Sequence, residues 1–303
     1  MRIKGIITAM VTPQNVNGID EIATRKMVNN LIEKGVHGLF ILGTNGEFFS
    51  ISKNDKLKFV KIVVDEAKGR VPVFAGAGAI STTESIELIN EFESIGVDAV
   101  SIITPYLIKL SQEELYYHYQ SIIENTNVPI ILYNIPQNTG INIEVGTLER
   151  LAESPKVIGI KDSSGNLDNL SNYINSINRR DFSVLVGSDS KILAALKLGA
   201  SGAVSGTSNV LTKTNIAIYN SFEKNNIENA QHYQESLEDF RRILKLQTVP
   251  SVLKKCLQMI DLEVGKPYLP VLPVKDDANI QEIFETLDQY KKIEGWSEIN
   301  AKA

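Results

Sequence analysis

Two residues at the ends of apolar runs carry the clearest chemistry in this sequence. Lys161 ends the run KVIGIK, and Tyr133 lies near the end of PIILYN. A lysine ordinarily titrates near pH 10.4, so its amine is a poor nucleophile at pH 7. Burial favours the neutral amine, which can form a Schiff base with a carbonyl substrate, and a neighbouring phenol can transfer protons. Taken singly, each has an ordinary alternative: a lysine that leaves its strand for solvent, and a core tyrosine.

Two glycine-rich segments invite a binding interpretation. The segment GTNGE, residues 43–47, permits a tight turn whose backbone N–H groups stay free for an anion such as a carboxylate. It lacks the G-K-[ST] ending of a phosphate-binding loop, and an ordinary strand-to-helix turn is the alternative. The segment FAGAGAIS resembles a dinucleotide fingerprint. However, Asp98 opens its strand and would face away from a ribose, which argues against a nicotinamide cofactor.

Metal-ligating residues are sparse. His37, His118 and His232 show no HxxxH or HxH spacing, and Cys256 is the single cysteine. This pattern predicts packing or surface roles for all four residues and no metal site. One cysteine excludes an intramolecular disulfide, which fits a cytoplasmic protein.

The composition is that of an ordinary globular chain. Of 303 residues, 43% are hydrophobic and 22% are charged, and the formal net charge is −5. These values argue against a disordered chain, a collagen and a coiled coil. No basic cluster suggests a nucleic-acid partner, and no apolar run approaches the 18 residues needed to span a membrane.

Eight apolar runs alternate with eight amphipathic segments. The runs are near-continuous, as expected for parallel strands that are buried on both faces. The phrases EKGVHGLF, SIGVDAVS and KLGASGAV recur where helices meet strands, and they place Gly35, Gly96 and Gly199 at left-handed helix caps. The predicted strands are 6–11, 36–42, 71–75, 98–104, 129–133, 156–161, 182–186 and 201–205. The predicted helices are 20–34, 53–68, 82–95, 112–125, 143–153, 166–177, 189–198 and 210–224.

Eight such units predict an α/β protein, a (β/α)8 TIM barrel over residues 1–225, with a doubly wound open sheet as the alternative. Helices predicted near 227–246, 250–262 and 278–292 follow without a linker, so residues 226–303 form a helical extension packed on the barrel. In this fold the active site lies at the carboxyl ends of the strands. Tyr133, Lys161 and the 43–47 segment all fall there.

Six segments in a common order resemble those of a known family. They are GTNGE (43–47), TPY (104–106), YNIPQNTG (133–140), GIKDSSG (159–165), GSDS (187–190) and GAVSGTSN (202–209). The sequence thereby resembles the superfamily of dihydrodipicolinate synthases and N-acetylneuraminate lyases, which are pyruvate-dependent class I aldolases. The resemblance implies a homotetramer, a dimer of dimers, that needs no metal or organic cofactor and acts on pyruvate and an aldehyde.

The resemblance also implies residue roles. Lys161 matches the Schiff-base lysine and Tyr133 the proton-transferring tyrosine. Thr44, which is also expected to be catalytic, and Asn45 match the positions that bind the pyruvate carboxylate, and Val204 offers its backbone carbonyl. The full set expected to bind substrate is Thr44, Asn45, Gly46, Tyr106, Asn138, Gly187, Ser188, Asp189, Val204 and Ser205.

Two departures from the synthase pattern shape the expected substrate. Asn138 stands where the synthases usually carry an arginine that grips the carboxylate of aspartate semialdehyde, and an amide cannot form that bidentate charged pair. Leu107 stands where a tyrosine usually joins a hydroxyl relay with Thr44 and Tyr133 from a neighbouring subunit. The stretch Glu47-Phe48 and Asn138 fit sugar-acid aldolases of the family.

We therefore expect an aldolase that forms or cleaves a 2-keto-3-deoxy sugar acid, with Ser188, Asp189, Ser205 and Thr207 binding sugar hydroxyls. The first alternative is a dihydrodipicolinate synthase, and a dehydratase is a variant on the same imine. A non-catalytic keto-acid-binding protein is the alternative from another class, because Leu107 cannot carry a proton.

Overall fold

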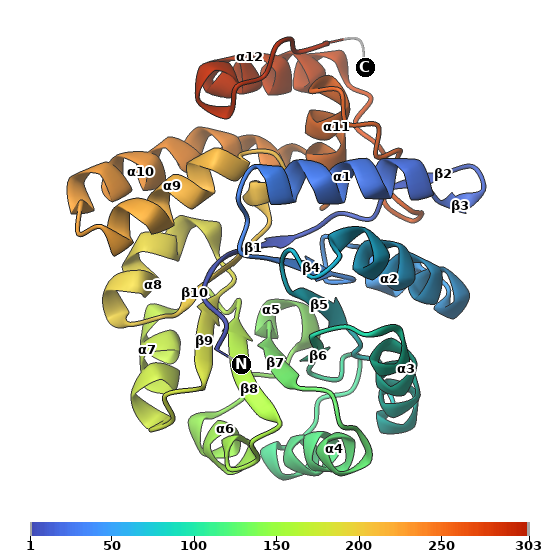
Figure 1. The fold of residues 1–303 in the computed structure, drawn as a ribbon, viewed down its shortest axis with the longest axis vertical. Helices are drawn as coiled ribbons and strands as arrows, with labels where there is room; N and C mark the ends of the chain where they lie inside the picture. The colour runs from blue at the N-terminus through green and yellow to red at the C-terminus, as the bar shows by residue number, and fades with distance from the viewer. Residues whose placement is uncertain (1, 302–303) are drawn as a thin grey trace.

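The computed structural model describes residues 2–301 and contains a closed barrel of eight parallel strands (Figure 1). Each strand pairs with the next one along the chain, and the first pairs with the last. The predicted (β/α)8 barrel is therefore confirmed. The strands are β1 (Gly5–Ala9), β4 (Gly38–Ile41), β5 (Val73–Gly76), β6 (Ala99–Ile103), β7 (Ile130–Asn134), β8 (Val157–Asp162), β9 (Ser183–Val186) and β10 (Gly202–Ser205).

One helix follows each strand and covers the outside of the barrel (Figure 1). These helices are α1 (Glu21–Glu33), α2 (Lys53–Ala67), α3 (Thr82–Ile95), α4 (Gln112–Asn125), α6 (Val145–Ala152), α7 (Leu167–Ser176), α8 (Ile192–Leu198) and α9 (Thr212–Glu223). Helix capping explains several boundaries. Ser52, Ser81 and Ser111 each accept the backbone N–H three residues later, which satisfies a donor that the first turn leaves free. Gly35, Gly96 and Gly199 have φ angles of 92°, 96° and 103°, so the predicted left-handed caps are confirmed.

Strand register decides which side chains enter the barrel. Side chains alternate between the two faces of a strand, so one set fills the interior and the other packs under the helices. The interior set forms a core of its own that includes Ile7, Phe40, Phe74, Ile131 and Leu185. The whole of β8 is buried on both faces. This double burial explains why the strands read as unbroken apolar runs.

Three helices follow the barrel strands and helices: α10 (Ile227–Ile243), α11 (Ser251–Met259) and α12 (Asp277–Glu294). We call residues 226–301 the annex. Helix α10 packs along α9, and α12 lies beyond it, at the opposite edge of the molecule from α4 and α6 (Figure 1). The buried Glu294 links the annex to the barrel by accepting the backbone N–H groups of Lys213 and Thr214. The division into domains at residue 225 stays a prediction.

Three short elements were not predicted from the sequence. Strands β2 (Gln14–Asn15) and β3 (Gly18–Ile19) form a hairpin, and α5 (Pro136–Thr139) follows β7. Two-residue strands are too short to show alternation, and a four-residue helix is too short to show a 3.6-residue period. The predicted helix at 189–198 begins instead with a 3₁₀ turn, Asp189–Lys191, before α8.

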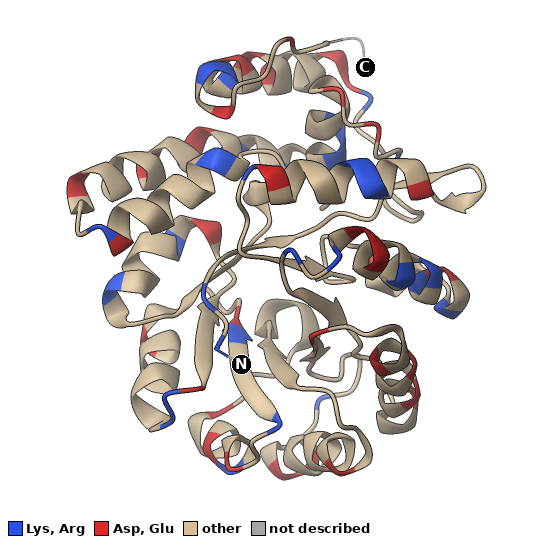
Figure 2. Cartoon of the chain, in the orientation of Figure 1, with Lys and Arg blue, Asp and Glu red and all other residues tan. Residues whose placement is uncertain are grey.

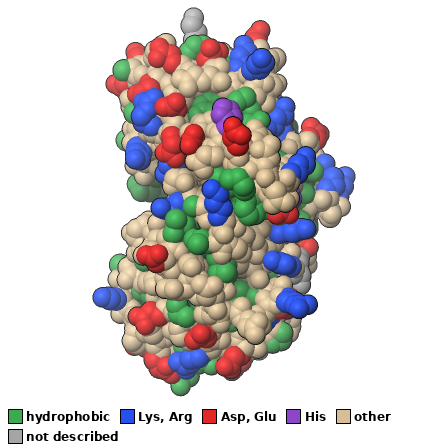
Figure 3. Space-filling model, turned by 90° about the vertical axis from the view of Figure 1, so that its left-hand side faces the viewer, with side chains coloured by type: hydrophobic (Ala, Val, Ile, Leu, Met, Phe, Trp, Pro, Cys, Tyr) green, Lys and Arg blue, Asp and Glu red, His purple; other side chains and the backbone are tan. Residues whose placement is uncertain are grey.

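The surface carries mixed charge. Acidic and basic residues lie mainly on the outer helices, whereas the strands are almost free of them (Figure 2). On the face shown in Figure 3, residues of both signs are interspersed with small apolar areas. Within residues 2–301, no helix is long and apolar enough to cross a membrane.

The first and last barrel strands, β1 and β10, approach closely at Gly5 and Gly202. A Cβ at Gly202 would lie 2.1 Å from the Gly5 carbonyl oxygen, whereas a Cβ at the exposed Gly146 would meet nothing within 4 Å. We expect Gly202→Ala to lower the free energy of unfolding by about 1–3 kcal/mol, because the backbone must shift. The control Gly146→Ala should leave it unchanged or raise it by up to about 1 kcal/mol, since alanine favours a helix. Urea unfolding would measure both; equal effects would contradict the close-approach argument.

Candidate active site

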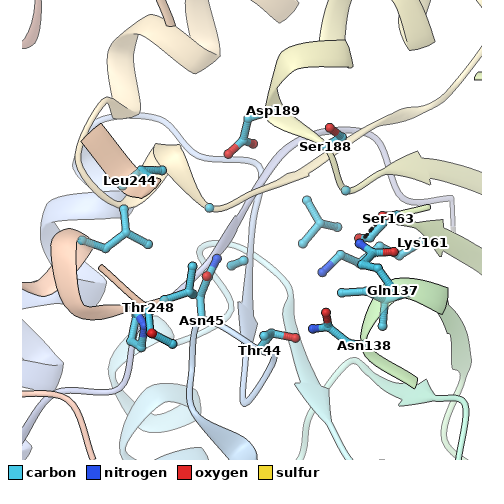
Figure 4. Close-up of a pocket in the computed structure, with 18 of the residues that line it drawn as sticks. Thr44, Asn45, Gln137, Asn138, Lys161, Ser163, Ser188, Asp189, Leu244 and Thr248 are labelled. Carbon is cyan, nitrogen blue, oxygen red and sulfur yellow. Dashed lines mark hydrogen bonds between the residues drawn. The ribbon is translucent and has the colours of Figure 1, made fainter. Parts of the chain in front are cut away.

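A pocket of about 700 Å³ opens at the carboxyl ends of the strands, between the barrel and the annex (Figure 4). Its barrel side carries polar groups, and its annex side is mostly apolar. The lining residues from the barrel are Ala9, Thr44, Asn45, Phe49, Tyr133, Ile135, Gln137, Asn138, Lys161, Ser163, Gly187, Ser188, Asp189, Val204 and Gly206. Those from the annex are Leu244, Thr248, Val249, Pro250, Val252, Leu253 and Val271.

Lys161 reaches this pocket from inside the barrel and is 4% exposed. Its Nζ lies 4.0 Å from the centre of the Tyr133 ring and 4.5 Å from that of Phe40. No carboxylate within residues 2–301 forms an ion pair with it. Tyr133 and Lys161 are register partners on β7 and β8, so their side chains leave the sheet on the same face. The amine is thus flanked by two aromatic rings, and its side chain is held on the same face of the sheet as that of Tyr133.

Space beside the lysine depends on a glycine. A Cβ at Gly187 would lie 3.0 Å from Cε of Lys161 and 1.9 Å from Oγ of Ser163. Any side chain there would push on the lysine stem. On the other side, Gln137 donates from Nε2 to the Ser163 carbonyl oxygen at 2.8 Å, which ties α5 to the end of β8 (Figure 4). The absence of a side chain at Gly187 therefore leaves room for the stem of Lys161 and for Ser163.

Tyr133 connects the lysine to the predicted turn. Its hydroxyl lies 3.3 Å from Oγ1 of Thr44, within hydrogen-bond distance. Tyr133 is buried, and its ring lies edge-on to Phe40. A hydroxyl pair in this position offers a short route for a proton between a reacting group near Lys161 and the turn at residue 44.

The segment 43–47 forms a tight turn at the pocket edge. The Glu47 N–H donates to the Thr44 carbonyl oxygen at 3.1 Å, and the Gly46 carbonyl oxygen accepts from Oγ1 of Thr12 at 2.7 Å. In the part of the chain that the structure describes, no hydrogen bond uses the backbone N–H of Thr44 or of Asn45. Free N–H groups beside a lysine suit an anionic substrate group.

The turn ends in a buried ion pair that the sequence analysis missed. Glu47 is 0% exposed and Lys254, on α11, is 1% exposed; their Oε2 and Nζ atoms lie 2.5 Å apart. The other Glu47 oxygen accepts the Tyr268 backbone N–H at 2.6 Å. Burial raises the pKa of Glu47, and Lys254 opposes that rise. A separation of 207 positions in the sequence gives no signal that these two residues meet.

Asp189 lines the pocket from the 3₁₀ turn that follows β9 (Figure 4). Its Oδ2 accepts the Thr207 backbone N–H at 2.9 Å, while Oδ1 has no hydrogen-bond partner within residues 2–301. Burial raises the pKa of this carboxyl, and the hydrogen bond from the Thr207 backbone N–H acts against that rise. Asp189 is the one carboxylate, and Lys161 the one cation, among the described residues that line the pocket.

The structure brings most of the predicted site residues to the pocket. Lining it are Thr44, Asn45, Tyr133, Asn138, Lys161, Gly187, Ser188, Asp189 and Val204. Three others lie apart. Gly46 contributes to the turn but not to the lining, Tyr106 lines a neighbouring hollow with Phe48, and Ser205 is buried with its hydroxyl bound to Oδ1 of Asn215. Leu107 is 86% exposed and lies outside the pocket.

Several lining residues were not predicted. Ser163 follows Lys161 by two positions, so it leaves the strand end on the same side, and strand alternation could have found it. Thr248, Leu253 and Val271 come from the annex. No pattern in the sequence shows which annex face covers the barrel mouth.

The sequence of this chain also matches a known protein family. The model of the dihydrodipicolinate synthetase family matches residues 2–289. The chain belongs to this family. Its barrel and its pyruvate-dependent Schiff-base chemistry are those of the family, as the sequence resemblance implied, and the chain is an enzyme of this class.

Two relatives and two solved structures illustrate the similarity. A 4-hydroxy-tetrahydrodipicolinate synthase of Halalkalibacterium halodurans is 38% identical over 93% of this chain and 95% of its own length. One of Methanopyrus kandleri is 36% identical over 91% and 93%. A dihydrodipicolinate synthase structure from Bacillus anthracis superposes with a TM-score of 0.91 at 34% identity, covering 95% and 99% of the two chains. A family member from Escherichia coli, YagE, solved in complex with pyruvate, gives 0.89 at 26%, covering 97% and 99%.

These relatives overturn the expected sugar-acid aldolase. The chain matches these proteins over most of their length, and they are named as synthases. This favours the alternative of a 4-hydroxy-tetrahydrodipicolinate synthase. The structure gives a physical reason for the error. Glu47 is bound to Lys254 away from the pocket, and neither Glu47 nor Phe48 lines it, so this dipeptide does not report on the substrate. Ser205 is bound internally and does not face a sugar.

The hydrogen bond between Tyr133 and Thr44 generates a prediction. Tyr133→Phe should lower turnover by about 10²–10⁴-fold, the usual effect of removing a positioned acid–base group. Thr44→Val should also lower turnover, because it removes the partner 3.3 Å away. Steady-state kinetics would measure both. The control Tyr219→Phe, beside His37 and outside the pocket, should keep its activity. An undiminished rate in Tyr133→Phe would contradict the assigned role.

Proposed function

We propose that this enzyme is a 4-hydroxy-tetrahydrodipicolinate synthase that condenses pyruvate with aspartate semialdehyde. The observation that carries the proposal is the placement of the Lys161 amine in the pocket, 4.0 Å from the ring of Tyr133, whose hydroxyl reaches Thr44. The names of the similar proteins supply the second substrate.

The first half of the reaction activates pyruvate. The Lys161 amine attacks the ketone carbon, and loss of water leaves a protonated imine. This imine is an electron sink, so the methyl group of pyruvate can lose a proton and give an enamine. Tyr133 and Thr44 form the hydroxyl pair that carries protons in these steps. The turn with free N–H groups at Thr44 and Asn45 binds the pyruvate carboxylate.

The second half forms the carbon–carbon bond. The enamine carbon attacks the aldehyde carbon of the second substrate, and the new alkoxide takes a proton through Tyr133. The semialdehyde's amine then attacks the imine carbon, which closes the ring and releases the Lys161 amine. Asn138, Ser188 and Asp189 line the part of the pocket that is left for the aldehyde.

The quaternary state and location are proposed on the family resemblance. We propose the homotetramer that the resemblance implies; the exposed Leu107 and Ile108, 86% and 62% accessible, are consistent with a subunit contact on that segment. One solved neighbour at 30% identity is a monomeric dihydrodipicolinate synthase variant. The cytoplasmic location likewise stays a prediction.

The Schiff base can be trapped directly. With pyruvate and borohydride, the protein should gain one reduced pyruvyl group on Lys161, located by peptide mass spectrometry. Lys161→Ala should lose both the adduct and condensation with aspartate semialdehyde, because no other lysine lines the pocket within residues 2–301. Lys156→Ala, whose amine bonds to the carbonyls of Ile123 and Thr126, is the matched control and should keep both. An adduct on another lysine would refute the assignment.

Asn138 provides a second prediction. It lines the pocket from α5, and no guanidinium accompanies it among the lining residues. Asn138→Arg should lower the KM for aspartate semialdehyde by about 10- to 100-fold, since hydrogen bonds to charged groups contribute about 1.5–3 kcal/mol. Asn138→Lys should give a smaller gain, because an ammonium cannot bind a carboxylate bidentately. Initial rates at saturating pyruvate would measure both; no gain from arginine would mean that the carboxylate lies elsewhere.

A further inference from the structure

The ion pair between Glu47 and Lys254 has no part in the proposed chemistry, yet it joins the substrate turn to the annex. Glu47 ends the turn 43–47, and Lys254 lies on α11. Both side chains are almost completely buried. Burying two charges requires close geometry and additional hydrogen bonds, so such a pair marks a place where position is specified.

We infer that Lys254 is a positioning residue for the carboxylate of the keto acid: through Glu47 it fixes the turn at residues 43–47, so the annex sets the affinity for an anionic 2-oxo acid. This inference rests on the proposed function, in which that turn binds the pyruvate carboxylate. Lys254 itself does not line the pocket. Its effect on the substrate passes through Glu47 and the backbone.

Glu47 connects the two parts through its backbone and its side chain. Its N–H closes the turn by donating to the Thr44 carbonyl oxygen at 3.1 Å. Its φ of 56° lies in the left-handed region, which is uncommon for a residue with a side chain and persists only where the surroundings hold it. The two contacts of its side-chain carboxylate are both from the annex: Nζ of Lys254 at 2.5 Å and the Tyr268 N–H at 2.6 Å.

Lys254 is in turn fixed within the annex. Its Nζ donates to the Lys266 carbonyl oxygen at 3.0 Å and lies 5.4 Å from the centre of the Tyr268 ring. On the barrel side, Oγ1 of Thr12 bonds to the Gly46 carbonyl oxygen. A Cβ at Gly46 would lie 2.9 Å from the backbone nitrogen of Leu42, so the turn packs closely against the chain before it. The turn is therefore held from both sides, and on the annex side the Lys254 amine and the Tyr268 backbone N–H both bind the Glu47 carboxylate.

The test distinguishes binding of the substrate's carboxylate from reaction at its ketone. Pyruvate and its methyl ester carry the same ketone, but only pyruvate carries the anion. For each probe, the concentration that gives half-maximal borohydride-reduced adduct on Lys161 is measured by intact-protein mass. Misplacement of binding groups by about 1 Å can cost 10²-fold. We expect Lys254→Met to raise the half-saturating pyruvate concentration by about 10-fold or more, and that of methyl pyruvate by less than about 3-fold.

Two further variants complete the design. Glu47→Gln/Lys254→Met removes both charges, so no unpaired buried charge remains, and it should show the same selective loss of pyruvate. Lys254→Arg keeps the charge and should recover part of the pyruvate affinity. Glu294→Gln is the matched control: it weakens another buried carboxylate that links the annex to the barrel, away from the turn, and should leave both probes within about 3-fold of wild type.

The outcomes are distinct. If wild-type protein gives no pyruvate adduct on Lys161, the proposed function fails. If wild type gives the adduct and Lys254→Met or the double variant binds pyruvate equally well, the inference alone is overturned. Equal losses for pyruvate and methyl pyruvate would overturn it too, because they indicate general disruption of the site. Should both variants fail to fold, Lys254→Arg decides through the same ratio of the two probes: a changed ratio supports the inference and an unchanged one overturns it.

Discussion

The closure of eight parallel strands is the constraint on which the rest of this molecule depends. Closure brings every carboxyl strand end to one rim, and the two-residue alternation fixes which side chains point inward. Lys161 and Tyr133 become register partners only because β7 and β8 pair in this way. The same closure buries the lysine beside the rings of Tyr133 and Phe40.

The annex completes the pocket that opens at the carboxyl ends of the barrel strands. It supplies the apolar wall of the pocket and, through Lys254 and Tyr268, both side-chain contacts of Glu47. A barrel without these residues would leave Glu47 as an unpaired buried carboxylate at the edge of the substrate turn, a costly arrangement. The turn, the ion pair and α11 therefore form one structural unit, although their residues come from opposite ends of the chain.

The catalytic part of the site was accessible to sequence reasoning, whereas the substrate was not. Lys161, Tyr133 and the 43–47 turn each follow a long apolar run, and runs of this kind predict buried strands well. The error over the substrate came from treating Glu47-Phe48 and Asn138 as reporters of the aldehyde. Glu47 faces the annex, and Asn138 is one amide at the pocket edge. The choice of substrate depends on a few contacts between the aldehyde and the side chains that line the pocket. Residue type alone does not say which side chains make these contacts.

The sequence by itself determined the eight-unit barrel, its glycine caps and the strand-end position of the lysine, because local periodicity and backbone preference act over a few neighbouring residues. Only the tertiary structure decided that Ser205 is bound to Asn215, that Tyr106 lines a neighbouring hollow and that Lys254 meets Glu47. These contacts join elements that pack against one another after the barrel closes. Their partners are chosen by geometry in three dimensions, for which a linear pattern carries no periodic signal.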